Sequence, residues 1–266
     1  MYDLYNRKIN YLRISVTDRC NLRCQYCMPE KGIPIIPHSE LLGFEVIARI
    51  VDVAARHGIT KIRLTGGEPL VRRNITGLVA LLSVIRGIED LSMTTNGILL
   101  PLYAEELKNA GLKRVNISLD TLDPEKFRKL TRHGNLEQVL EGIEAALSNG
   151  FTPVKINMVQ NEFTEENDII QVREYTEKHG LELRIIREMD REKGKFWPVE
   201  GGDGGHCQLC NRLRLSSNGY FYPCLFSDRK YSVREFGIEG AMLKALENKP
   251  ESGRGIGLNK MCSIGG

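Results

Sequence analysis

The sequence predicts an α/β fold in which helices cover a parallel sheet. Short apolar runs typical of strands alternate about six times with segments of helical periodicity, and several of these segments end at a glycine. The expected strands span residues 12–17, 61–64, 91–94, 115–119, 153–158 and 183–186. The expected helices span residues 45–57, 76–85, 103–110, 136–148 and 168–178. In folds of this kind the functional site lies at the carboxyl ends of the strands.

The alternation of strands and helices stops near residue 190. Residues 191–207 read REKGKFWPVEGGDGGHC, a polar and glycine-rich stretch that is typical of a linker. We therefore expect a parallel sheet wrapped by helices over residues 1–190 and a small cysteine-bearing region over residues 191–266.

Composition indicates an ordinary globular protein. The 266 residues are 41% hydrophobic and 27% charged, and the formal net charge of +3 is too small to indicate a nucleic-acid-binding surface. No run of about 18 apolar residues occurs, and the first ten residues lack the apolar stretch of a signal peptide. We expect a cytoplasmic protein with no membrane or nucleic-acid partner.

Six of the seven cysteines form two close groups, a placement that argues against a disulfide framework. The first group has the spacing C-x3-C-x2-C and the second has C-x2-C-x13-C, whereas Cys262 stands alone near the terminus. The first group is Cys20, Cys24 and Cys27, and the second is Cys207, Cys210 and Cys224. Clustered thiolates of this kind usually hold a metal.

Three thiolates suit a [4Fe-4S] cluster with one reactive iron. Such a cluster ordinarily takes four cysteines, so three leave one iron open to another ligand. The alternative for the first group is a zinc site or spare thiols. The alternative for the second group is a zinc site with His206 as the fourth ligand.

Basic residues recur on one face of the expected strands. Lys61 and Arg63 are two residues apart, so both point away from Ile62 and Leu64. The same parity places Arg13 with Ser15 and Thr17, Lys155 with Asn157, and Arg212 with Arg214. Cations that point into a barrel indicate an anionic ligand, although each alone is also compatible with a solvated surface. No phosphate-binding loop of the form G-x4-G-K-S/T occurs.

The first cysteine motif, with Tyr26 before its last cysteine, resembles the radical S-adenosylmethionine superfamily, and TGGEPL at residues 65–70 resembles the glycine-rich element of that superfamily. Within it, the chain resembles the MoaA-type GTP 3′,8-cyclase family, which begins molybdenum cofactor biosynthesis. The stretches that carry this resemblance are RISVTDRCNLRCQYCMP, KIRLTGGEPLVRR, MTTNG, NISLDTL, VKINMV, CNRLRLSSNGYFYPCLF and the terminal IGG.

The resemblance implies a partial (β/α)6 barrel of radical SAM type with a C-terminal cluster-binding appendage. It implies two [4Fe-4S] clusters, one on each cysteine group, and S-adenosylmethionine on the open iron of the first. It further implies conversion of GTP to (8S)-3′,8-cyclo-7,8-dihydroguanosine 5′-triphosphate, with the purine at the second cluster. The implied partners are an electron donor and a downstream cyclic pyranopterin synthase, and a homodimer is left open.

The resemblance also implies roles for individual residues. It assigns Gly67, Ser118 and Met189 to S-adenosylmethionine, with Tyr26 near the adenine. The residues that it assigns to GTP are Arg13, Arg63, Thr94, Lys155, Arg212 and Arg214, and we expect Lys61 and Arg184 to join the same basic pocket. The terminal Gly265 and Gly266 resemble a glycine tail that enters the site; the alternative is a terminus without a role.

The chain departs from the family between the last expected strand and Cys207. This segment is shorter than in the family, and Arg187 stands where the family usually has Glu. A second hypothesis is therefore a radical SAM maturase that acts on a peptide or another small molecule. A third is a non-enzymatic zinc-binding protein.

Overall fold

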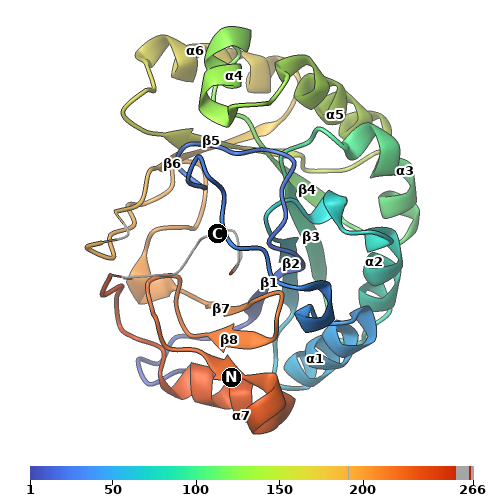
Figure 1. Cartoon of the computed structure of the whole chain (residues 1–266), viewed down its shortest axis with the longest axis vertical. Coiled ribbons are helices and arrows are strands. Elements are labelled where there is room, and N and C mark those ends of the chain that lie inside the picture. Colours follow the sequence, from blue (N-terminus) through green and yellow to red (C-terminus); the bar gives the residue numbers. More distant parts are fainter. Residues whose placement is uncertain (191, 256–263, 265–266) are drawn as a thin grey trace.

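A computed structural model describes residues 1–190, 192–255 and 264 of the chain (Figure 1). Its main feature is a nine-stranded sheet of order β6-β5-β4-β3-β2-β1-β7-β8-β9 within these residues. The first six strands are parallel and lie in sequence order. They are β1 (Tyr11–Ser15), β2 (Lys61–Thr65), β3 (Asp90–Thr95), β4 (Arg114–Ser118), β5 (Lys155–Gln160) and β6 (Glu182–Arg187).

Helices connect the parallel strands and cover the outer side of the sheet (Figure 1). The α-helices are α1 (Phe44–Arg56), α2 (Ile75–Ser83), α3 (Leu100–Asn109), α4 (Pro124–Thr131), α5 (Leu136–Ser148), α6 (Glu166–Lys178) and α7 (Val233–Glu247). The described part of the chain also contains the short 3-10 helices η1 (His38–Glu40), η2 (Pro69–Val71) and η3 (Cys207–Leu209). The predicted α/β fold is confirmed, and each of the six predicted strands and five predicted helices is present with small changes at its ends.

The core explains why these strands align. Ile62 and Leu64 of β2 are fully buried in the apolar cluster between sheet and helices, whereas Arg63 points to the inner face. On β2, apolar side chains therefore face the helices and basic side chains face the opposite side of the sheet, as the sequence predicts.

The C-terminal region continues the same sheet. Strand β7 (Arg212–Leu215) pairs parallel with β1, and β8 (Tyr220–Tyr222) and β9 (Tyr231–Ser232) follow in antiparallel order. Helix α7 packs on β8, β9 and α1. Strands from both sides of residue 190 thus belong to one sheet, and the division into regions 1–190 and 191–266 stays a prediction.

Helix α4 is an element that periodicity does not predict. Its first turn is capped by Asp123, whose Oδ1 accepts hydrogen bonds from the backbone N–H groups of Glu125 at 2.8 Å and Lys126 at 3.0 Å. Pro124 occupies the first helical turn. An aspartate followed by a proline is a sequence signal for a helix start, and it could have located α4.

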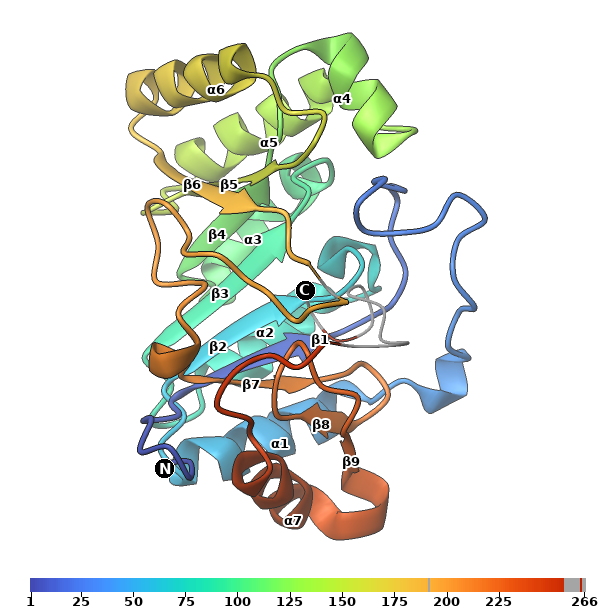
Figure 2. The same cartoon turned by 90° about the vertical axis from the view of Figure 1, so that its left-hand side faces the viewer.

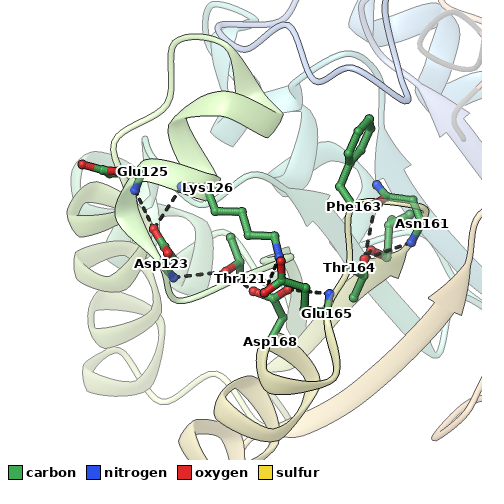
Figure 3. A network of polar contacts seen from close by, with 10 residues as sticks. Thr121, Asp123, Glu125, Lys126, Asn161, Phe163, Thr164, Glu165 and Asp168 are labelled. Carbon is green, nitrogen blue, oxygen red and sulfur yellow. Dashed lines mark hydrogen bonds and ion pairs between the residues drawn. The ribbon is translucent and has the colours of Figure 1, made fainter.

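A polar network joins α4 to α6 (Figure 3). Lys126 of α4 forms an ion pair with the buried carboxylate of Asp168 on α6. Asp168 also accepts hydrogen bonds from the Thr121 hydroxyl at 2.6 Å and from the backbone N–H of Glu165 at 2.8 Å. Burial acts to raise the pKa of Asp168, but the hydrogen bonds from Lys126 and Thr121 outweigh it, so the pKa is lowered.

We predict that Asp168→Asn lowers the free energy of unfolding at pH 7 by about 1.5–3 kcal/mol, because it removes charge-assisted hydrogen bonds. The lowered pKa means that this stabilisation is present above the unfolded pKa of about 4 and is lost as the pH falls below it. Urea unfolding followed by circular dichroism measures both effects. The control is Glu165→Gln, because the Glu165 side chain is 80% exposed and lies 3.7 Å from Lys126. Equal losses in the two variants would contradict the prediction.

Candidate functional site

A cavity of about 320 Å³ lies on the inner face of the sheet, within the range of small-molecule sites. Its lining comes from the first cysteine loop, from β1 to β7, and from the segment after β6. Most residues predicted for the site contribute to this lining. They are Cys20, Cys24, Cys27, Tyr26, Gly67, Ser118, Met189, Arg13, Lys61, Arg63, Thr94, Arg184, Arg212 and Arg214.

Three arginines lie side by side in the centre of the lining. Arg13 of β1 is in register with Arg63 of β2 on one side and with Arg214 of β7 on the other. Burial, followed by the charge of Arg214, lowers the pKa of Arg13 well below its ordinary value. Burial also lowers the pKa of Arg63, and burial together with Arg212 lowers that of Arg214 to about 10. Each shift shows that the charged form is disfavoured here, and an anion in the cavity would relieve it.

Several polar atoms in the lining lack a hydrogen-bond partner in the described part of the chain. They include the Thr94 hydroxyl and the Nε atoms of Arg184 and Arg212. Buried polar groups are normally paired, so these atoms are suited to a bound polar ligand.

Tyr11 and Arg114 also line the cavity, and the sequence analysis missed both. The Tyr11 ring lies 5.5 Å from the guanidinium carbons of both Arg63 and Arg212. Burial acts to raise the pKa of its hydroxyl, but Arg63, Arg13 and Arg212 outweigh it and lower the pKa. The parity argument could have found Arg114, because it shares one face of β4 with Ser118.

Lys155 and Lys61 differ in their positions. Lys155 lies outside the lining and forms an ion pair with Glu182 on the adjacent strand. Lys61 lines the cavity but is exposed. The assignment of Lys155 to GTP stays a prediction.

The first cysteine group lies in the loop after β1. Backbone N–H groups of Cys27 and Met28 both donate to the Cys24 carbonyl at 3.0 Å, and Arg23 N–H donates to the carbonyl of Thr131, the last residue of α4, at 3.2 Å. Burial, followed by the nearby Cys27, Asp120 and Cys20, raises the pKa of Cys24. A thiol in this setting becomes a thiolate when a metal compensates its charge.

The thiols of the first group can serve as ligands of a [4Fe-4S] cluster. Within residues 1–190, 192–255 and 264, no three His, Cys, Asp or Glu side chains converge on one ion position. In a [4Fe-4S] cluster each thiolate binds a different iron, so its ligands surround a larger body than one ion. The three thiols of the first group line one cavity, as the ligands of such a cluster would. His206, the alternative fourth ligand of the second group, is exposed.

The glycine-rich element holds the cysteine loop in place. The N–H of Gly67 donates to the Thr17 carbonyl at 2.8 Å, and that of Glu68 donates to the Arg19 carbonyl at 2.8 Å. A Cβ on Gly67 would lie 2.2 Å from the Arg19 carbonyl oxygen. The missing side chain thus permits close approach to the backbone of the cysteine loop.

Two buried carboxyl groups flank this end of the cavity. Glu68 accepts from the Thr95 hydroxyl at 2.7 Å and the Asn96 N–H at 2.7 Å, and burial raises its pKa to about 7. Asp120 accepts from the Tyr26 hydroxyl at 2.9 Å, and burial raises its pKa to about 6. Tyr26 is therefore fixed beside the thiols by a residue that follows β4.

The second cysteine group gathers at the opposite end of the strands. Cys207 and Cys210 precede β7, which runs parallel to β1. Cys224 follows β8, which runs antiparallel to β7, so it returns to the same end. Figure 2 shows the blue loop after β1 and the orange turn before β7 at opposite ends of the sheet. Lys249 donates to the Cys210 sulfur at 3.4 Å.

The lone Cys262 and the expected glycine tail, Gly265 and Gly266, lie outside the described residues. None of the described helices has the length and apolar character needed to cross a membrane.

Comparisons with known proteins agree with this geometry. The radical SAM superfamily pattern matches residues 14–175. A GTP 3′,8-cyclase of Thermodesulfovibrio yellowstonii is 39% identical over 322 aligned positions that cover 100% of both chains. That of Alkaliphilus oremlandii is 42% identical over 299 positions, covering 94% of this chain and 93% of the relative.

Solved structures share the fold. The crystal structure of Streptococcus suis SuiB has a TM-score of 0.68 at 16% identity, covering 92% of this chain and 68% of SuiB. The superfamily pattern spans more than half of the chain, and the relatives at 39% and 42% identity extend over nearly all of it. The chain therefore belongs to the radical SAM superfamily and, within it, to the GTP 3′,8-cyclase family.

Proposed function

We propose that this protein is a radical SAM enzyme that converts GTP to 3′,8-cyclo-7,8-dihydroguanosine 5′-triphosphate, the first step of molybdenum cofactor biosynthesis. One observation carries the proposal. A row of guanidinium groups with disfavoured charge faces the same cavity as three thiols at the carboxyl ends of the parallel strands. A triphosphate would bind these groups through charge-assisted hydrogen bonds and favour their charged form.

We assign two roles to residues of the cavity. Tyr26, Gly67, Ser118 and Met189 line the same cavity as the first cysteine group and would hold S-adenosylmethionine. The guanidinium groups of Arg13, Arg63, Arg184, Arg212 and Arg214, with Lys61 and the Thr94 hydroxyl, would orient GTP. When bound, the two [4Fe-4S] clusters and S-adenosylmethionine supply the radical chemistry, and the protein positions the ribose and excludes water.

The maturase hypothesis is the second candidate. SuiB has been solved with a precursor peptide, and it shares the fold of this chain at 15% identity. The buried arginine row favours a polyanion over a peptide in this cavity. Anaerobic incubation with S-adenosylmethionine, a reductant and GTP, followed by mass analysis, tests the proposal. A chain that turns over a peptide but leaves GTP unchanged would overturn it.

The proposal includes partners and a compartment. We infer a separate electron donor and a cyclic pyranopterin synthase that receives the product, and a homodimer is compatible with this function. Two groups of cysteines with the spacing of metal ligands favour a reducing compartment such as the cytoplasm.

We predict that Arg63→Met raises the Kd for GTP about 10- to 100-fold, because a charge-assisted contact contributes about 1.5–3 kcal/mol. Calorimetry on the reconstituted protein measures the affinity, and iron analysis confirms that the clusters remain. Arg56→Met is the matched control, because Arg56 is exposed on α1 and pairs with Asp52. Lys155→Met should weaken binding less than Arg63→Met, since Glu182 already pairs with Lys155. An unchanged affinity in Arg63→Met would remove Arg63 from the GTP site.

The two cysteine groups should have separable functions. We predict that Cys24→Ser abolishes formation of 5′-deoxyadenosine, whereas Cys210→Ser loses GTP turnover but still forms 5′-deoxyadenosine slowly. Each variant should lose about half of its iron on the basis of four irons per cluster. Chromatographic assay of 5′-deoxyadenosine with metal analysis measures both. Loss of zinc with unchanged iron in Cys210→Ser would show that the second group holds zinc.

A further inference from the structure

Lys249 is a buried lysine at the second cysteine group. It directly follows the last turn of α7 and its C-cap residue, and only 3% of it is exposed. Its ammonium donates to the Cys210 sulfur at 3.4 Å, to the Arg212 carbonyl at 2.7 Å and to the Pro223 carbonyl at 2.9 Å. Arg212 lies two residues after Cys210, and Pro223 directly precedes Cys224. One side chain thus contacts the chain segments of two of the three cysteines.

No carboxylate among the described residues pairs with the charge of Lys249. The ion pairs formed among residues 1–190, 192–255 and 264 do not include it, and its other two contacts are neutral carbonyl groups. A buried ammonium requires a compensating negative charge. The thiol sulfur of Cys210 is the group in contact with Lys249 that can carry that charge.

Arg7 provides an informative contrast on the same segment. Its guanidinium donates to the Cys207 carbonyl at 2.8 Å and to the carbonyls of Pro250 and Glu251 at 2.7 and 2.9 Å. The buried Asp3 carboxylate accepts from its Nε at 2.6 Å. Arg7 therefore holds the segment of Cys207, and the Asp3 carboxylate neutralises the charge of Arg7. The ammonium of Lys249, in contrast, is directed at the Cys210 sulfur.

We propose that Lys249 is a positioning residue of the second cluster, which holds the Cys210 and Cys224 segments together and raises the reduction potential of the cluster that they bind. This inference rests on the proposed function, because it requires a [4Fe-4S] cluster on the second cysteine group. Hydrogen bonds to the sulfurs and net charge are two factors that set the potential of such clusters. A cation that donates to a ligand sulfur stabilises the reduced, more negative state.

The test compares the full chain carrying Cys24→Ser with the same chain carrying Lys249→Met in addition. The Cys24→Ser background leaves the second cluster as the source of the signal, which iron analysis verifies. A redox titration followed by electron paramagnetic resonance should show a more negative midpoint in the Lys249→Met chain. We expect the reduction equilibrium to change at least tenfold, which corresponds to about 59 mV for one electron.

Matched variants separate the effect of the positive charge on the potential from the effect of the hydrogen bonds that hold the cysteine segments together. Lys249→Arg keeps the positive charge and should retain a midpoint close to that of the background. Lys244→Met removes an exposed lysine of α7 and should change neither iron content nor potential. Arg7→Met should lower the iron content but leave the midpoint of the remaining cluster unchanged.

The outcomes distinguish this inference from the proposed function. A background chain that binds zinc and no iron would overturn both. If the midpoint potential of the cluster is the same in the Cys24→Ser chain and in the chain that also carries Lys249→Met, the role of Lys249 is overturned but the proposed function is not. If Lys249→Met loses the cluster, its retention in Lys249→Arg supports the inference, and its loss from both variants in a folded chain contradicts it.

Discussion

Arg13, Arg63 and Arg214 are held next to one another on three parallel strands, and this arrangement determines much of what the molecule can bind. The opposite face of β2 carries Ile62 and Leu64, which are fixed in the apolar core. The strand cannot rotate to release its arginine to solvent without exposing these side chains. Packing of the core therefore keeps the cations in the cavity, where burial disfavours their charge and an anion restores it.

Strand direction explains why the two cysteine groups lie at opposite ends of the sheet. In parallel strands the carboxyl ends meet at one edge, which brings the loop after β1 beside the glycine-rich element after β2. Strand β7 joins this sheet in parallel, so the residues before it lie at the other edge. The antiparallel return of β8 adds Cys224 to that edge. The thiols of the first group and the arginine row line the cavity, and the residues that follow Cys210 and Cys224, Asn211 and Leu225, line it as well.

Local patterns were sufficient to predict the six parallel strands, the two cysteine groups and most of the basic lining. They succeeded because period-two alternation and thiol spacing are properties of neighbouring residues. Tyr11 and Lys249 were missed because their roles depend on contacts across the sheet and around α7. For Lys155, parity alone was not sufficient. Its position on β5 is compatible with the site, but Glu182 on β6 pairs with its charge. Parity predicts a face, whereas the partner of a side chain depends on tertiary structure.

The segment between β6 and Cys207 is folded against the cavity even though its composition is typical of a linker. Phe196, Val199 and Asp203 line the cavity, and a Cβ on Gly205, whose φ is +88°, would lie 1.9 Å from the Trp197 carbonyl oxygen. Such close backbone contact requires glycine and gives the segment a defined path. The alignment with the Thermodesulfovibrio relative extends over 322 positions against 266 residues here, so the relative contains residues that this chain lacks.

Arg187 lies outside the cavity lining, and its guanidinium stacks 4.4 Å from the centre of the Trp197 ring. The residues that the segment between β6 and Cys207 contributes to the cavity are mainly apolar or glycine, with Asp203 as their charged member. The positive charge of the site comes from the strands and not from this segment. A difference in the segment can therefore change the wall around a substrate while the cations that would hold a triphosphate remain in place.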